Sequence, residues 1–396
     1  MDVLAELNPA QVAAVQAVDG PVLVLAGPGS GKTRVLTHRV GYLISARGVR
    51  PYRILAVTFT NKAAREMISR LESLIGEDAE RLTIGTFHAI CARILRREAA
   101  YVGVDSHFAI LDQDDQRRLI TRVLKEVDLD NKLYRPAAVQ GIISRAKNDL
   151  ITPETYQPPT YWHEGVRRAF ECYEKIKAEN KGLDFDDLLL LVERLFREND
   201  EVRGRYQQRY EHVLVDEFQD TNKAQYEIIR HLAGERRNVF VVGDEDQSIY
   251  SWRGADFRNV LRFRSDFPDA QVHLLEQNYR STQTVLDAAQ AIIAQNDQRT
   301  DKNLWTDNPG GRRIQVFEAY DERQEADYVV GEIQRLVARS VCQFRDCAVM
   351  FRTNAQSRVL EETLVRHGLP YKLVGATRFY QRREIKDVLC YLRAVY

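Results

Sequence analysis

The sequence predicts an α/β protein built on an open parallel β-sheet, and three observations support this fold class. Short runs rich in Val, Ile and Leu recur along the chain, which is typical of strands buried on both faces of a sheet. Amphipathic helical patterns separate these runs, as at 62–71, where Ala63, Met67 and Leu71 recur every four residues. Polar clusters follow the runs, and ligands of open α/β sheets gather beyond the carboxyl ends of the strands.

The first sheet is predicted to contain one strand for each apolar run before residue 276. These runs are residues 21–26, 54–59, 82–87, 212–215, 238–242 and 272–275. The polar clusters that follow them are residues 27–33, 58–62, 86–88, 216–220 and 243–247. Because parallel strands end at the same edge of a sheet, we expect these clusters to lie together and to form one ligand-binding surface.

A helical insertion is predicted to split the first sheet domain. Strand runs disappear after residue 104, and helical patterns dominate, as at 115–127 and 166–180. Pro153, Pro158 and Pro159 mark a loop within this region. The predicted first domain therefore consists of residues 1–104 and 188–274, with the insertion at 105–187.

A second α/β pattern occupies residues 275–396 and is predicted to be an incomplete domain. Its expected strands are 314–317, 347–351 and 371–374, and its expected helices are 323–339, 355–367 and 382–396. The last helical pattern has no Gly or Asn stop signal, so we expect the sequence to end inside a helix.

The composition excludes several classes of protein. The 57 Lys and Arg balance the 57 Asp and Glu, so any contact with nucleic acid must come from a local groove. The 5 Cys include no C-x-x-C pair and the 8 His show no metal-ligand spacing, which predicts reduced thiols and no structural zinc. The N-terminus lacks a signal peptide and no apolar run is long enough for a membrane span, which predicts a soluble cytoplasmic protein.

A phosphate-binding loop is predicted where the first strand meets the next helix. The segment 21–34 reads PVLVLAGPGSGKTR, and its glycines leave backbone N–H groups free to surround phosphates at a helix N-terminus. Lys32 can reach the β- and γ-phosphates, and the Thr33 hydroxyl can bind Mg²⁺. The candidate nucleotide-binding residues here are Ala26, Gly27, Pro28, Gly29, Ser30, Gly31, Lys32, Thr33 and Arg34.

Two carboxylates end a later strand. The segment VLVDEFQD at 213–220 places Asp216 and Glu217 directly after an apolar run. We expect Asp216 to hold Mg²⁺ together with Thr33, and Glu217 to polarise the attacking water. An apolar run followed by two acids is a weak signal alone, but together with the phosphate-binding loop it predicts a nucleotide hydrolase.

The chain resembles the front part of the UvrD/Rep/PcrA group of superfamily 1 DNA helicases. The matching motifs are LNPAQ, AGPGSGKT, AVTFTNKAAREM, GTFHAICARIL, DFDDLL, VDEFQDTN, VGDEDQSIYSWRGA, QNYRST and FRTNAQSR, in the family order and over essentially the whole sequence. The resemblance implies a RecA-like P-loop motor domain with a parallel sheet, an α-helical insertion, and part of a second RecA-like domain.

The resemblance also implies roles for single residues. Gln11 is similar to the glutamine that reads adenine, and Tyr279 to the aromatic residue that stacks on it. Gln247 resembles the sensor of the γ-phosphate, and Arg280 resembles an arginine finger. The implied catalytic set is Lys32, Asp216, Glu217, Gln247 and Arg280, with ATP and Mg²⁺ as cofactors.

A set of side chains is expected to contact single-stranded DNA. Aromatic rings stack on any base without reading sequence, and basic or amide groups bind phosphates or base edges. The residues alone favour core packing for Phe59 and Phe185 and an exposed stacking site for Tyr250 and Trp252; the resemblance places all four on DNA. The full set is Phe59, Asn61, His88, Phe185, Tyr250, Trp252, Arg253, Arg352 and Asn354.

The expected function is ATP-dependent movement 3′-to-5′ on single-stranded DNA, with unwinding at single-strand/duplex junctions, in DNA repair or replication. The protein is expected to be a monomer or weak dimer that does not bind membranes. The sequence ends before later family motifs, so this portion is expected to be weak or inactive alone. The alternatives are a helicase subunit of a recombination nuclease and a nucleotide-gated single-stranded DNA-binding clamp. A small-molecule kinase would share only the phosphate-binding loop.

Overall fold

The structure is a computed structural model that describes residues 3–249, 254, 256, 258–296, 299–374 and 391. The chain divides into two compact units, Met1–Arg312 and Arg313–Tyr396, and each is described by itself. The first unit therefore includes residues 275–312, which the sequence patterns assign to the second domain. Hydrogen bonds from these residues to the phosphate-binding loop, described below, explain why they pack with the first sheet.

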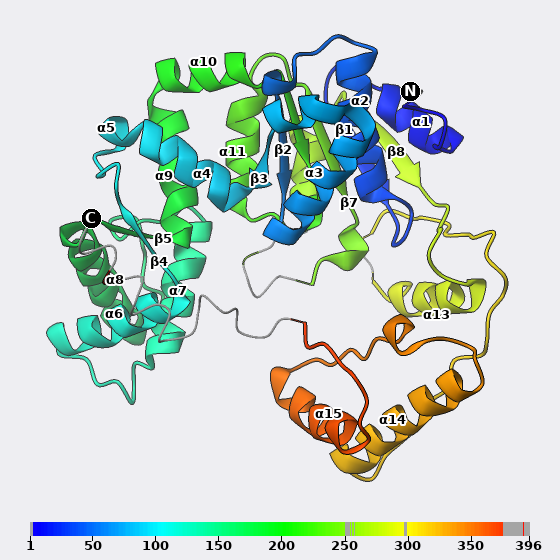
Figure 1. Ribbon diagram of the computed structural model, residues 1–396. Helices are drawn as coiled ribbons and strands as arrows, with labels where there is room; N and C mark the ends of the chain where they lie inside the picture. The colour runs from blue at the N-terminus through cyan, green and yellow to red at the C-terminus, as the bar shows by residue number, and fades with distance from the viewer. Residues whose placement is uncertain are drawn as a thin grey trace. The chain divides into compact units, whose positions relative to one another are not determined.

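The first unit contains a six-stranded parallel sheet in the order β3-β2-β6-β7-β1-β8 (Figure 1). The strands are β1 (Val22–Ala26), β2 (Ile54–Thr58), β3 (Thr83–Thr86), β6 (His212–Val215), β7 (Val239–Gly243) and β8 (Gln271–Leu275). All six apolar runs predicted as strands are confirmed. Every residue of β1, β2 and β7 is buried, as expected for strands covered on both faces.

Helices cover both faces of this sheet (Figure 1). Successive strand residues face opposite sides, so Val22 and Val24 belong to one core cluster and Leu23 and Leu25 to the other. The Val22 cluster includes residues of α1 (Pro9–Gln16), α2 (Lys32–Ser45) and α3 (Asn61–Ile75). The Leu23 cluster includes residues of α4 (Phe87–Arg97), α9 (Phe185–Glu198), α10 (Asp200–Arg209), α11 (Lys223–Ala233) and α12 (Arg258–Asp266).

The predicted insertion folds as a helical cluster with a core of its own. It contains α6 (Gln113–Glu126), α7 (Pro136–Asn148) and α8 (Tyr161–Glu179), and the short helix α5 (Ala99–Val102) comes just before it. Residues such as Val123, Val139 and Phe170 pack together apart from the two sheet cores. The expectation that strands are absent here is wrong, because β4 (Ala109–Leu111) and β5 (Gly182–Asp184) form a short parallel pair. This pair closes the insertion where the chain enters and leaves it.

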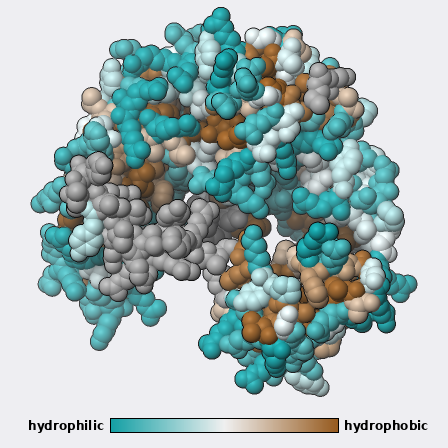
Figure 2. Space-filling view, in the orientation of Figure 1, coloured by the Kyte–Doolittle hydropathy of each residue, from teal (hydrophilic) through white to brown (hydrophobic). Residues whose placement is uncertain are grey.

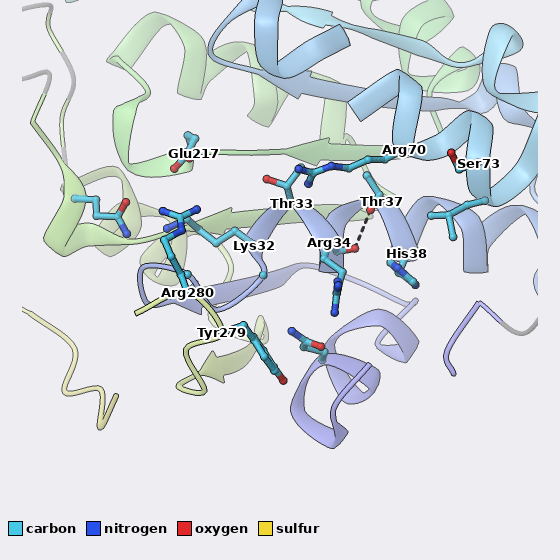
Figure 3. Close-up of a pocket in the computed structure, with 15 residues that line it drawn as sticks. Lys32, Thr33, Arg34, Thr37, His38, Arg70, Ser73, Glu217, Tyr279 and Arg280 are labelled. Carbon is cyan, nitrogen blue, oxygen red and sulfur yellow. Dashed lines mark hydrogen bonds between the residues drawn. The ribbon is translucent and has the colours of Figure 1, made fainter. Parts of the chain in front are cut away.

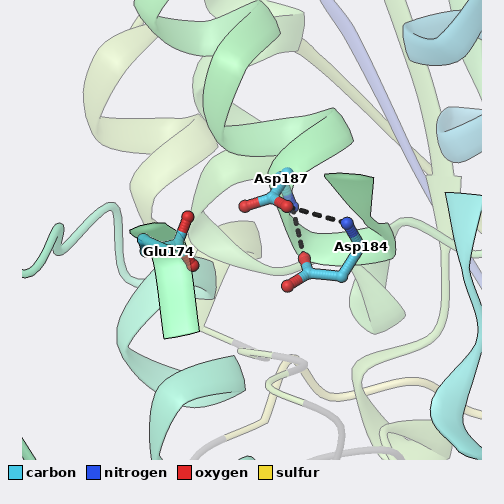
Figure 4. A group of neighbouring side chains, drawn as sticks. All are labelled: Glu174, Asp184 and Asp187. Atoms are coloured by element: carbon cyan, nitrogen blue, oxygen red, sulfur yellow. Dashed lines mark hydrogen bonds between the residues drawn. The ribbon is translucent and has the colours of Figure 1, made fainter. Parts of the chain in front are cut away.

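A buried ion network joins the insertion to α9. The ammonium nitrogens of Lys147 and Lys177 lie 2.5–3.2 Å from carboxylate oxygens of Glu174, Asp184 and Asp187. Figure 4 shows these three carboxylates pointing toward one another, an arrangement that alone resembles a metal site. The two lysines already pair with these carboxylates, so the cluster is structural. Despite burial, the three acids hold the pKa of Lys147 well above its usual value, so this lysine stays charged.

Lys147→Met is expected to lower the free energy of unfolding by about 3–5 kcal/mol, because it leaves buried carboxylates without one of their two cations. Equilibrium urea unfolding followed by circular dichroism measures this change. Lys175→Met is the matched control, since Lys175 lies exposed on the same helix as Lys177. A loss below about 1 kcal/mol for Lys147→Met, comparable to a surface substitution, would contradict the prediction.

The second unit contains α14 (Glu322–Ala338) and α15 (Asn354–Arg366), which confirms two predicted helices. The predicted strands 314–317, 347–351 and 371–374 are not formed. A strand requires a hydrogen-bonded neighbour, and these segments have none among the described residues. Their apolar side chains, including Val316 and Met350, are exposed, and Figure 2 shows brown surface gathered on this unit. The expected helix 382–396 lies outside the described residues, apart from Tyr391.

Several shorter elements connect these parts. Helix α13 (Gln283–Ile293) follows β8, and 3₁₀ turns occur at Pro51–Arg53, Gly76–Arg81, Phe218–Asp220, Glu245–Gln247 and Phe344–Asp346. Within the described part of the chain, every helix is too short or too polar to cross a lipid bilayer.

Candidate active site

The phosphate-binding loop connects β1 to α2 in the predicted way. Gly29 and Gly31 have φ angles of 68° and 89°, a left-handed conformation that glycine adopts without steric cost. The Ser30 hydroxyl donates to the Gly27 carbonyl over 2.7 Å and tightens the turn. A Cβ atom at Gly31 would lie 2.8 Å from the Gln11 side chain, so this position also needs glycine for space. The loop is therefore shaped for close approach of a ligand to its backbone.

The first two residues of α2 lie beside the acidic strand ends. The Lys32 Nζ donates to the Ala26 carbonyl over 3.4 Å and lies 4.0 Å from an Asp244 carboxylate oxygen. The Thr33 hydroxyl donates to the Asp216 carboxylate over 3.3 Å. The two predicted Mg²⁺ ligands, Thr33 and Asp216, are thus in direct contact although 183 positions separate them in sequence. A hydroxyl and a carboxylate are oxygen ligands of the kind that Mg²⁺ prefers.

Asp216 and Glu217 follow β6 directly. Burial, with a smaller contribution from Glu217, raises the pKa of Asp216 to about 6. A bound cation would favour the ionised form of this carboxylate. Glu217 adopts φ 50°, an unusual left-handed conformation for a residue with a side chain. Its carboxylate accepts a hydrogen bond of 2.9 Å from the Gln219 amide, which fixes its direction.

A cavity of about 760 Å³ lies over the loop and is lined by most of the predicted nucleotide-site residues (Figure 3), but not by Ala26, Gly27, Pro28, Ser30 or Asp216. In Figure 3 the side chains of Lys32 and Arg280 lie near each other, with Glu217 on the same side of the cavity. The lining residues are Gln11, Gly29, Gly31, Lys32, Thr33, Arg34, Thr37, His38, Arg70, Ser73, Leu74, Glu217, Gln247, Tyr279 and Arg280. The lining residues that were not predicted from the sequence are Thr37, His38, Arg70, Ser73 and Leu74. They lie on α2 and α3, outside the motifs with an expected role.

One end of the cavity is formed by Gln11 and Tyr279. The Gln11 amide donates to the Ser30 carbonyl over 2.9 Å, and Gln11 also completes the capping box of α1 with Asn8. The Asn8 amide in turn donates to the Tyr279 hydroxyl over 2.7 Å. Both residues thus line the cavity, and the base-binding roles expected for them stay predictions.

Asn278 is a residue whose role was not predicted from the sequence. Its side-chain oxygen accepts from the backbone N–H groups of Arg280 and Ser281 over 2.8 and 2.7 Å. Its amide donates to the Pro28 carbonyl, and the Tyr279 N–H donates to the Gly29 carbonyl over 3.0 Å. Asn278 therefore fixes the backbone of Arg280 against the phosphate-binding loop.

Asp244, at the end of β7, connects three polar side chains. It accepts from the Gln247 amide over 2.6 Å and from the Lys302 ammonium over 2.6 Å, and its N–H donates to Gln219. Burial opposes charging of Lys302, but Asp244 and Asp246 raise its pKa. Lys302 therefore neutralises Asp244 as a permanent cation. This leaves Lys32, at the longer distance of 4.0 Å, available for phosphate.

Four predicted DNA-contacting residues follow the strand ends of the same unit. Phe59 and Asn61 lie after β2, with Asn61 exposed at the start of α3. Phe185 is 42% exposed, and its ring packs edge-on against His88, with ring centroids 5.7 Å apart. Burial lowers the pKa of His88 to about 4, so its imidazole is neutral near pH 7. A neutral ring favours contact with a base over an ion pair with a phosphate.

Comparison with known proteins decides the family. The UvrD/REP helicase N-terminal domain matches residues 7–268, and the UvrD-like helicase C-terminal domain matches residues 273–396. The chain belongs to the UvrD/Rep helicase family. This confirms the resemblance stated from the motifs, and the sheet and helices agree with the RecA-like fold of UvrD/Rep helicases.

Relatives of this UvrD/Rep chain carry the name ATP-dependent DNA helicase PcrA. The Bacillus subtilis (strain 168) protein is 49% identical over 394 residues, which is 99% of this chain and 53% of the relative. A Staphylococcus epidermidis protein (strain ATCC 12228) is 48% identical over 391 residues, 98% of this chain and 54% of the relative. The Staphylococcus aureus (strain COL) protein is 47% identical over 394 residues, 99% of this chain and 54% of the relative. The chain spans about half the length of the curated relatives it matches.

The other five predicted DNA contacts of this UvrD/Rep chain lie outside the described residues or in the second unit. Tyr250, Trp252 and Arg253 lie outside the described residues. Arg352 is exposed in the second unit, where its N–H donates to the side chain of Gln356 over 3.0 Å. The backbone of Asn354 begins α15, but its side chain lies outside the described part. Like the four DNA-contact assignments described above, these five stay predictions.

Proposed function

We propose that this protein is an ATP-dependent DNA helicase that moves along single-stranded DNA and separates strands at junctions with duplex DNA. One observation carries the proposal: a single cavity brings together Lys32, Glu217 and Arg280, which come from three distant motifs. The PcrA relatives, named as ATP-dependent DNA helicases, support the same activity.

Each group in the cavity has a chemical task in ATP hydrolysis. The loop N–H groups and Lys32 would bind the β- and γ-phosphates, and Gln11 and Tyr279 would hold the base. Thr33 and Asp216 would hold Mg²⁺, which supplies charge stabilisation on the phosphate oxygens. Glu217 would orient and deprotonate the attacking water. Arg280 would neutralise charge that develops on the transferred phosphoryl group.

The direction of movement, the biological role and the location of the protein are supported by different observations from the ATPase activity. Movement 3′-to-5′, a role in DNA repair or replication, and action in the cytoplasm rest on the family resemblance. We also propose that full activity requires residues beyond the 396 of this chain, because the relatives extend to nearly twice this length. The four domain segments predicted from the sequence are part of the same proposal.

A nucleotide-gated DNA-binding clamp is the second candidate. The observation that favours it comes from the second unit. Among the described residues, the three apolar segments predicted as strands there form no hydrogen-bonded strand pairs. A chain with a nucleotide cavity but no paired strands in the described part of its second unit would bind both ligands without efficient turnover.

Steady-state ATP hydrolysis with and without oligo(dT) distinguishes these functions. The 396-residue chain and a version extended to the length of its relatives are compared, each beside its Lys32→Ala variant. We expect DNA-stimulated turnover in the extended protein and its loss in the variant. If both forms bind nucleotide and DNA but neither hydrolyses ATP, the clamp replaces the helicase.

A further inference from the structure

Asn148, the last residue of α7, contacts two segments that have proposed roles in ATP hydrolysis or DNA binding and lies close to a third. Its side-chain oxygen accepts a hydrogen bond from the Asn222 amide, and its own amide donates to the Asp186 carboxylate over 3.1 Å. A Cβ atom at Gly254, the glycine of the YSWRG segment that follows β7, would lie 3.5 Å from the Asn148 Cβ. Asn148 is only 7% exposed, and it lies outside every motif recognised in the sequence.

The contact with Asn222 leads to the catalytic acids. Asn222 ends the segment that begins with Asp216 and Glu217, and its side-chain oxygen caps α11 by accepting from the Gln225 N–H. Between these ends the chain forms a tight 3₁₀ turn, in which the Thr221 hydroxyl donates to the Phe218 carbonyl over 2.7 Å. A short hydrogen-bonded turn therefore links Glu217 to Asn222.

The contact with Asp186 leads to the proposed DNA surface. Asp186 lies in the first turn of α9, directly after Phe185, whose exposed ring packs against His88. Lys147, the neighbour of Asn148, binds Asp184 and Asp187 on either side of this position. The end of α7 therefore fixes the start of α9, and with it the position of the Phe185 ring.

We propose that Asn148 is a positioning residue that couples the catalytic loop at Glu217 to the base-stacking ring of Phe185. The inference rests on the proposed function. An amide suits this place because it accepts from Asn222 on one side and donates to Asp186 on the other. Asn148 itself is not among the residues that line the nucleotide cavity. Its effect is on how binding of one ligand changes the response to the other.

The test uses the longest form of the protein that shows DNA-stimulated ATP hydrolysis. Asn148→Asp keeps an acceptor for Asn222 but places a second carboxylate against Asp186. We expect ATP hydrolysis without DNA to stay within about twofold, while stimulation by oligo(dT) falls at least about tenfold. In coupled sites, binding of one ligand typically changes the affinity for the other by about 5–150-fold. In Asn148→Asp, a non-hydrolysable ATP analogue should leave the affinity for oligo(dT) nearly unchanged.

A double variant tests the hydrogen bond itself. Asn148→Asp combined with Asp186→Asn exchanges donor and acceptor, so the bond can form in the opposite direction, and stimulation should recover at least partly. Asn180→Ala is the matched control, because Asn180 caps the end of α8 and its amide donates to a backbone carbonyl of the same helix. It should leave both activities unchanged.

Three outcomes would overturn the inference. If Asn148→Asp shows the same stimulation by oligo(dT) as the wild type, and the same effect of the ATP analogue on oligo(dT) affinity, Asn148 does not couple the two sites. If basal and stimulated hydrolysis fall equally and the double variant does not recover, Asn148 has a merely structural role. The same conclusion holds if Asn148→Asp unfolds and the double variant does not recover. Absence of DNA stimulation in every wild-type form would instead remove the proposed function on which the inference depends.

Discussion

Arg280→Ala is expected to lower the rate constant of ATP hydrolysis by about 10³–10⁵-fold, the range found when arginine fingers are removed. The guanidinium lines the cavity together with Lys32, and Asn278 fixes its backbone against the phosphate-binding loop. The backbone of Arg280 is therefore held in place before the reaction starts, and groups that need little reorganisation stabilise developing charge most effectively. ATP binding should change far less, because the loop and Lys32 remain.

Single-turnover hydrolysis at saturating ATP and oligo(dT) measures this effect, and fluorescent-nucleotide titration measures binding. Arg280→Lys is the informative companion, since it keeps the charge but loses the planar fork that binds two phosphate oxygens. We expect an intermediate rate for it. A loss below about tenfold in Arg280→Ala would show that another cation supplies the stabilisation.

Glu217→Gln is expected to lower the same rate constant by about 10²–10⁴-fold, the usual contribution of a positioned general base. Glutamine has nearly the same shape, so the hydrogen bond from Gln219 can persist through the amide oxygen. The substitution removes the basic carboxylate and leaves the nucleotide contacts in place. ATP should therefore bind about as tightly as to the wild type, and the bound state should persist.

Rapid-quench measurement of phosphate formation tests this expectation. Glu235→Gln, an exposed glutamate on the surface after α11, is the control for the same chemical change. Wild-type rates in Glu217→Gln would mean that another group activates the water. Asp220, which is buried and has a pKa raised to about 6 by burial and by Glu217, would then be the next residue to replace.

The first sheet could be predicted from sequence because its strands are buried on both faces. Such strands are continuous apolar runs, and the one preceding the phosphate-binding loop is buried at every residue. The pair β4 and β5 could not be predicted, since each strand has three residues and Gly182 and Asp184 are poor strand formers. In the second unit, by contrast, apolar runs that predict strands do not form them. An apolar run becomes a strand only when a neighbouring strand pairs with it.

The site could be predicted to the extent that its residues lie next to strand ends. Lys32, Asp216 and Glu217 can be found in this way, before any family is considered. Lys302 and Asn148 were missed because their roles depend on partners far along the chain. Lys302 bonds Asp244 58 positions earlier, and Asn148 bonds Asn222 74 positions later. Neither spacing belongs to a repeating pattern that could be recognised in the sequence.

The order of strands in the sheet has a consequence for how the chain reaches its folded state. Strand β1, which carries the phosphate-binding loop, pairs only with β7 and β8 among the described strands, and Val22 aligns with Phe240 and Gln271. Such distant pairing closes a long loop and slows folding, whereas the helices of the insertion touch near neighbours and can form early. During synthesis, the backbone edges of β1 have no strand partner until almost the whole first unit has left the ribosome. The proposed nucleotide cavity is thus among the last parts of the first unit to be completed, and we expect it to form only after the central sheet has assembled.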